Sequence, residues 1–154
     1  MVLVSERADH DAEKISIAAL ERFMARARRS VGLGGKVTVL LSADSEIREL
    51  NRSFRGKNKT TDVLSFPSAN GNGYAGDIAI SIEAAQRQAR EHGHSTAEEI
   101  RILMLHGMLH LAGMDHERDN GAMLRKESRL RRELGLKEGL IARVRDKRTR
   151  VRKK

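Results

Sequence analysis

Residues 95–116 read STAEEIRILMLHGMLHLAGMDH, and they combine an apolar helix with three histidines. The run Ser95-Thr-Ala-Glu98 is a capping box, which predicts that a helix begins here. Five of the six residues before His106 are apolar, so the helix is expected to lie in or beside the core. Gly113 is expected to end the helix, because glycine adopts the left-handed conformation that turns the chain back.

The spacing of the histidines predicts a metal site. Since His106 and His110 are four residues apart, their side chains lie about 40° apart around the helix and about 6 Å apart along it. His116 could not join them on a continuing helix, but a bend at Gly113 brings it back. This H-x3-H-x5-H arrangement on a helix and turn is zincin-like, and it predicts one Zn²⁺ per chain with a fourth position open to water. The alternative is a set of ordinary core or surface histidines, although unpaired buried imidazoles are costly.

Length and composition restrict the possible classes of protein. The chain has 154 residues, which fits a single domain with a real core. It contains no cysteine, so disulfides, cysteine-ligated zinc and thiol nucleophiles are excluded. Neither a signal peptide nor a bilayer-spanning run is visible, so a cytoplasmic protein without a membrane partner is expected.

The positive charge is concentrated at the C-terminal end. The chain has 30 Lys and Arg against 21 Asp and Glu, a net charge of +9. Residues 140–154 hold eight of these positive charges and one negative, so residues 1–139 carry only +2. We therefore expect a domain at 1–139 and a basic, flexible tail at 140–154, which either binds polyanions or is merely solvated.

Hydrophobic periodicity predicts an α+β fold in a single domain, with a small mixed sheet of three or four strands packed with helices. Strand pairing stays open at this level. The helices are expected at residues 14–31, 44–53, 82–92, 95–113 and 121–134, and the strands at 36–41, 63–66 and 77–81, with a loop at 67–75.

The histidine spacing also occurs in zinc proteases of the metzincin type. In those enzymes a glutamate after the first histidine acts as the base. Here that position is Gly107, so peptide hydrolysis lacks its base. A metallopeptidase is therefore the least favoured of the functions considered.

Three segments of the chain together resemble one protein family. They are RGKNKTTDVLSFP at 55–67, GDIAIS at 76–81 and HGMLHLAGMDH at 106–116. In this order they are similar to the YbeY family, the bacterial rRNA maturation endoribonucleases, over roughly residues 36–134. The basic tail is a departure, because the family usually ends soon after the last helix.

The resemblance implies a cytoplasmic, zinc-dependent, single-strand-specific endoribonuclease acting in 16S rRNA 3′-end processing and ribosome quality control. It implies ligation by His106, His110 and His116, and a functional arginine at Arg55. The implied partners are rRNA and the small ribosomal subunit, with ribosomal-protein or GTPase partners. The alternative in another class is a non-catalytic ribosome-assembly factor with a structural zinc site.

Four further residues are candidates for the chemistry. We expect Arg55 to hold the scissile phosphate, with Lys57 and Lys59 guiding the RNA backbone; otherwise all three belong to a solvated polar loop. Asp115 either orients an imidazole or caps the turn after Gly113, and less readily acts as a general base.

The remaining polar residues are not expected to take part in the chemistry. His92 and His94 flank Gly93 and are expected to be ordinary exposed loop residues. Asp62 and Asp77 are expected to have structural roles at strand ends.

Overall fold

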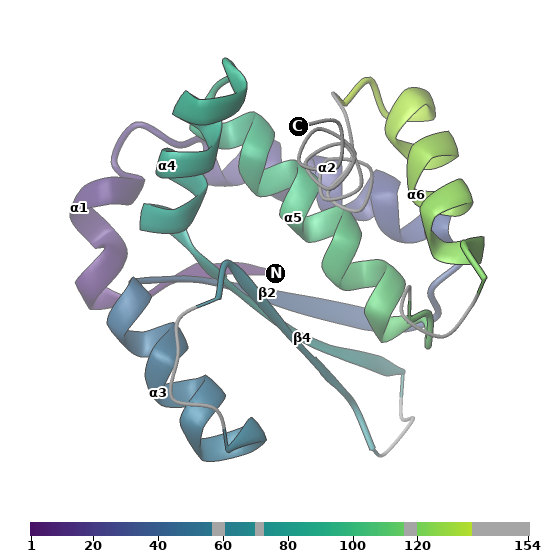
Figure 1. Ribbon diagram of the computed structural model, residues 1–154, viewed down its shortest axis with the longest axis horizontal. Helices are drawn as coiled ribbons and strands as arrows, with labels where there is room; N and C mark the ends of the chain where they lie inside the picture. Colours follow the sequence, from purple (N-terminus) through teal and green to yellow (C-terminus); the bar gives the residue numbers. More distant parts are fainter. Residues whose placement is uncertain (57–60, 70–72, 116–119, 137–154) are drawn as a thin grey trace, which may run out of the picture.

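Four strands form one mixed sheet with helices on both of its faces in the computed structural model (Figure 1). The structure describes residues 1–56, 61–69, 73–115 and 120–136. The predicted tail at 140–154 lies outside the described residues.

The strands are β1 (Val2–Val4), β2 (Lys36–Ser42), β3 (Val63–Pro67) and β4 (Tyr74–Ser81). The helices are the short η1 (Glu6–Ala8) and α1 (Asp9–Ala12), then α2 (Ile17–Val31), α3 (Asp44–Arg55), α4 (Ile82–His92), α5 (Thr96–Leu111) and α6 (Ala122–Glu133).

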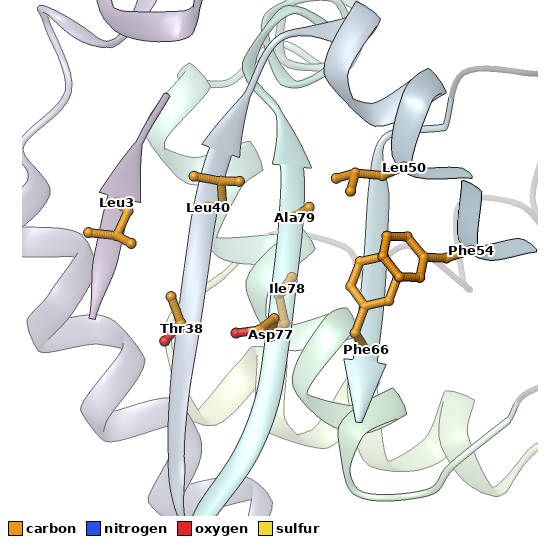
Figure 2. Close-up of a pocket in the computed structure, with 9 residues that line it drawn as sticks. All are labelled: Leu3, Thr38, Leu40, Leu50, Phe54, Phe66, Asp77, Ile78 and Ala79. Carbon is orange, nitrogen blue, oxygen red and sulfur yellow. The ribbon is translucent and has the colours of Figure 1, made fainter. Parts of the chain in front are cut away.

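The sheet order is β1-β2-β4-β3. The first three strands in this order run parallel, and β3 pairs antiparallel with β4. Figure 2 shows the four strands side by side, with β3 at one edge and pointing the opposite way. The predicted α+β class with a small mixed sheet is confirmed.

Alternation along β4 divides the interior into two cores. Ile78 and Ile80 belong to the main core, which α2, α4 and α5 build on one face of the sheet. Ala79 points the other way and packs with Ile47 and Leu64 in a smaller core under α3. Helix α3 therefore lies across the sheet from α4 and α5 (Figure 1).

Helix α5 begins and ends as its sequence predicts. The Ser95 hydroxyl accepts a hydrogen bond from the Glu98 N–H at 3.1 Å. At the other end the helix stops at Leu111, and Gly113 has a φ of 90°. The left-handed glycine turn is therefore present where the histidine spacing required one.

Three sequence predictions were incomplete. Strand β1 was missed, because three residues are too few to show the alternation of apolar and polar side chains typical of a strand. Its pairing with β2 includes a hydrogen bond from the Val39 N–H to the Met1 carbonyl at 2.9 Å. The helix predicted from residue 14 begins at Ile17, since Ser16 is its N-cap. The predicted loop 67–75 is shorter, because β4 begins at Tyr74.

Asp44 joins the start of α3 to the start of α4. Its carboxylate accepts hydrogen bonds from the Ser81 hydroxyl and from Arg87 Nη1, the latter at 2.9 Å. Partial burial raises the pKa of Asp44. The hydrogen bonds from Arg87 and Ser81 and the nearby positive charges lower it, and together they outweigh the effect of burial, so the pKa lies below its ordinary value.

We expect Asp44→Asn to make the protein less sensitive to acid. A carboxyl with a lowered folded-state pKa stabilises the fold at any pH above its unfolded pKa of about 3.9, and this stabilisation is lost as the pH falls through the folded value. Urea unfolding at pH 6 and pH 3 should show a larger loss of stability for the wild type than for the variant. An equal loss in both proteins would contradict this role for Asp44.

Candidate metal centre

His106 and His110 bring two ring nitrogens together on one face of α5. Their Nε2 atoms are 3.1 Å apart, and the rings meet edge to face with centroids 4.7 Å apart. Two nitrogen ligands at 2.0–2.1 Å from a tetrahedral zinc ion are themselves about 3.3 Å apart. The pair therefore has close to the spacing of two ligands to one ion.

Glu127 of α6 supports this pair from behind. Its Oε2 lies 2.8 Å from Nδ1 of His106, and the two side chains are only 2% and 7% exposed. A carboxylate at Nδ1 favours the tautomer in which that nitrogen carries the proton, which leaves the Nε2 lone pair for a metal. This carboxylate–histidine arrangement is typical of metal centres.

Sequence reasoning missed Glu127, although a signal was present. Met123, Glu127 and Leu130 are the buried residues of α6, and they share one face at helical spacing. A glutamate on an apolar face needs a partner, because carboxylates are almost never buried unpaired.

A cleft of about 280 Å³ lies between β3 and α5, and both histidines line it. The other lining residues come from β3 and the segment just before it: Thr61, Asp62, Val63, Ser65 and Pro67. The Ser65 hydroxyl donates to the Gly107 carbonyl at 3.2 Å, which ties this strand to the helix. The nitrogen pair therefore faces a cleft that is large enough for part of a substrate.

A second hollow, of about 370 Å³, opens on the α3 face of the sheet, away from the histidines (Figure 2). Phe54 and Phe66 meet edge to face at one side of it, with ring centroids 5.4 Å apart. Asp77 is the one charged side chain among its described lining residues, and its carboxylate accepts a hydrogen bond from the Tyr74 hydroxyl, which raises the pKa of Tyr74. This mostly apolar surface offers no set of metal ligands.

The structure describes only part of the predicted site. It brings His106 and His110 together, whereas His116, Lys57 and Lys59 lie outside the described residues. Within the described ranges no group of three His, Cys, Asp or Glu side chains is placed to hold a metal ion. The third ligand therefore stays a prediction.

The other two predicted residues fall at the ends of helices. Arg55 is the last residue of α3, which extends two residues beyond its predicted end at residue 53, and Gly56 follows with a φ of 67°. Asp115 lies just beyond the Gly113 turn and is partly buried.

The prediction of an exposed His94 was wrong. Its side chain is 4% exposed and pairs with the fully buried Glu99, with Nε2 and Oε1 2.7 Å apart. The partner lies five residues along the chain in α5, so the loop composition around Gly93 concealed the contact.

Gly107 allows α5 to lie close against the sheet. A Cβ atom at this position would be 2.9 Å from Cγ2 and 3.0 Å from Cδ1 of the buried Ile78. Residue 107 therefore points into the core and not into the cleft. A glutamate placed as in a metzincin protease has no room here, which removes the remaining support for a metallopeptidase.

We expect Gly107→Ala to destabilise the fold by up to about 2 kcal/mol, because the helix-propensity gain of about 1 kcal/mol offsets only part of an overpacking cost of about 1–3 kcal/mol. In an Ile78→Ala background the clash is absent, and the same change should be neutral or stabilising. Urea unfolding of the four proteins measures this double-mutant cycle. The same destabilisation in both backgrounds would show that Ile78 is not the obstacle.

Fold and site together define an α+β protein in which a buried helix presents a carboxylate-supported histidine pair to a cleft beside an edge strand. The sequence model described as "Endoribonuclease YbeY" matches residues 4–135. This chain belongs to the YbeY family. Within the described ranges no helix combines the length and the apolar character of a membrane span.

Individual relatives support this assignment. A Koribacter versatilis protein named Endoribonuclease YbeY is 54% identical over 130 residues, which cover 84% of this chain and 85% of the relative. A Solibacter usitatus protein of the same name is 53% identical, with 82% and 84% covered. The solution structure of a Thermotoga maritima protein superimposes with a TM-score of 0.58 at 30% identity, covering 87% of this chain and 89% of that one.

Proposed function

We propose that the protein is a zinc-dependent endoribonuclease that cuts single-stranded RNA. The observation that carries the proposal is the convergence of the His106 and His110 Nε2 atoms, 3.1 Å apart at a cleft, with Glu127 behind them. Membership of a family whose curated relatives are named endoribonucleases supports the reaction class. The proposed role is 16S rRNA 3′-end processing and ribosome quality control in the cytoplasm.

The residues present fit a zinc ion. Neutral imidazole nitrogens are common zinc ligands, and in this proposal His116 supplies the third one, for one ion per chain. Zinc in such a site supplies Lewis-acid stabilisation of a phosphoryl oxygen and activation of water.

The chain's own residues have separate roles in this proposal. Glu127 holds the proton on Nδ1 of His106 and fixes the ring. Arg55 holds the scissile phosphate through charged hydrogen bonds, while Lys57 and Lys59 attract the RNA backbone. Asp115 orients an imidazole or caps the turn after Gly113.

The proposed partners follow from the same role. They are rRNA and the small ribosomal subunit, together with ribosomal proteins or a GTPase. In this proposal the basic segment 140–154 adds salt-dependent attraction to RNA.

One observation favours a second candidate, an assembly factor whose zinc is structural. The carboxylate of Asp62, which lines the cleft, accepts a hydrogen bond from Gln88 Nε2 at 3.0 Å and another from the Thr61 hydroxyl. It is therefore engaged in structure, and the described lining offers no other carboxylate as a base for hydrolysis.

Cleavage of single-stranded rRNA fragments, with zinc content measured in the same samples, separates these two functions. We expect His110→Ala to lose both zinc and cleavage, because a ligand is removed. Arg55→Ala should lose cleavage and keep its zinc, because it removes only the phosphate contact. Equal cleavage by wild type and His110→Ala would indicate a contaminating nuclease and favour the assembly factor.

We expect Glu127→Gln to weaken zinc binding about 10- to 100-fold, since the charge that orients His106 and raises its basicity is lost. Competition with a chromophoric chelator measures the affinity. Glu133→Gln is the matched control, because that side chain lies on the same helix and is 55% exposed. Equal zinc affinity in both variants would remove Glu127 from the metal centre.

A further inference from the structure

The strand beside the histidines is an edge strand of the described sheet. In the sheet order β1-β2-β4-β3, strand β3 has β4 on one side and no other strand in the described part of the chain on the other. Figure 2 shows it as the outermost strand, the one that carries Phe66. Its second edge therefore has backbone groups available for a ligand.

The register determines which backbone groups point outward. Residues of β3 bond to β4 at alternate positions, as in any antiparallel pair. The Ser81 N–H donates to the Asp62 carbonyl at 2.9 Å, and the Ser68 N–H donates to the Ala75 carbonyl at 3.0 Å, in line with the register of the ladder between them. The even-numbered residues of β3 therefore direct their N–H and C=O groups at β4, and the odd-numbered residues direct theirs toward the outer edge of the sheet.

The outward groups are those of Val63, Ser65 and Pro67. Proline at the third position agrees with this assignment, because a proline is tolerated where its missing N–H would have pointed away from the ladder. Each of the first two residues thus offers a donor and an acceptor side by side on this outer edge.

This edge borders the candidate metal centre. Val63, Ser65 and Pro67 line the same cleft as His106 and His110. The hydrogen bond from the Ser65 hydroxyl to the Gly107 carbonyl, 3.2 Å long, holds the strand at a fixed distance from the helix. A ligand on the edge therefore lies beside the histidines.

We propose that the outward edge of β3, at Val63 and Ser65, binds the Watson–Crick edges of nucleotides next to the scissile bond and so selects unpaired RNA. The inference rests on the proposed function and gives it a structural basis for substrate choice. Every RNA base carries a donor next to an acceptor on its Watson–Crick edge, which complements the N–H and C=O of one strand residue. In a duplex these base groups are already paired, whereas proteins read them in single strands.

Two features of the cleft favour a nucleotide over an added peptide strand. An added β-strand gains its affinity from a run of main-chain hydrogen bonds, and this edge supplies only two N–H groups before Pro67. The described lining of the cleft contains no Phe, Tyr or Trp side chain, and its two histidine rings are assigned to the metal ion, so in this proposal bases are held there by hydrogen bonds and not by stacking.

Methylated oligouridylates test the proposal on the wild-type, zinc-loaded protein. Fluorescence anisotropy at low temperature, with RNA integrity checked on gels, compares a 12-mer of uridine with its N3-methyl and C5-methyl forms. N3-methylation blocks the Watson–Crick edge, while C5-methylation adds the same bulk elsewhere. We expect about tenfold weaker binding for the N3-methyl form, from the loss of about one to two net hydrogen bonds, and a change below about twofold for the C5-methyl form.

Equal affinity for the N3-methyl and C5-methyl forms, with unmodified RNA still bound and cut, would overturn the inference and leave the proposed function standing. Failure to bind or cut any of the three oligomers would overturn both.

Ser65→Pro tests the edge from the protein side, with Ser65→Ala as its matched control. Both lose the hydroxyl, but only proline removes the outward N–H while leaving the ladder to β4 intact. We expect Ser65→Pro to unfold cooperatively, to bind the unmodified oligomer about fivefold more weakly than Ser65→Ala, and to discriminate less against the N3-methyl form. A folded Ser65→Pro variant with the same affinity for the unmodified oligomer and the same discrimination against the N3-methyl form as Ser65→Ala would overturn the inference. If Ser65→Pro does not fold, the comparison of the methylated oligomers on the wild-type protein decides.

Discussion

The close approach of α5 to β4 at Gly107 is the constraint on which the site depends. Since residue 107 has no side chain, the helix lies directly against the buried Ile78. His106 and His110, on either side of Gly107 in the sequence, then share the face of the helix that opens to the cleft. The same contact places the Gly107 carbonyl within reach of the Ser65 hydroxyl. One glycine thus fixes the distance between the histidine pair and the edge strand.

The second constraint is electrostatic. His106 and Glu127 are both almost completely buried, so each needs hydrogen-bond partners there, and each supplies one to the other. Their contact anchors α6 to α5 and fixes the ring nitrogen that faces the cleft. A buried pair of this kind is costly to build, and a metal centre, as proposed, gives it a role beyond stability.

The elements that were predicted well from the sequence are determined by residues close together in the chain. Helix 82–92 has the predicted bounds, and the Ser95 cap and the left-handed Gly113 are where the pattern placed them, because caps and turns depend on neighbouring residues. The convergence of His106 and His110 follows from helix geometry alone. These features needed no knowledge of the tertiary fold.

The features that sequence missed depend on contacts between distant segments. Strand β1 is defined by its pairing with β2, some 37 residues away in the register. Glu127 meets His106 across two helices, 21 residues along the chain. The contact of His94 with Glu99 is nearer in sequence, but it depends on how the loop before α5 packs against that helix. Strand order and the place of β3 at the edge of the described sheet are likewise properties of the assembled sheet, which no local pattern encodes.

In the proposed metal centre, α5 directs the Nε2 atoms of His106 and His110 at one ion, while Glu127 keeps the proton on Nδ1 of His106. Nitrogen-15 NMR of histidine-labelled protein reads both properties, because it resolves the tautomer of each ring and the nitrogen that binds metal. We predict that one equivalent of zinc shifts Nε2 of His106 and of His110 while Nδ1 of His106 stays protonated. Zinc that leaves both Nε2 resonances unmoved, or a His106 protonated at Nε2 in the zinc-loaded protein, would contradict it.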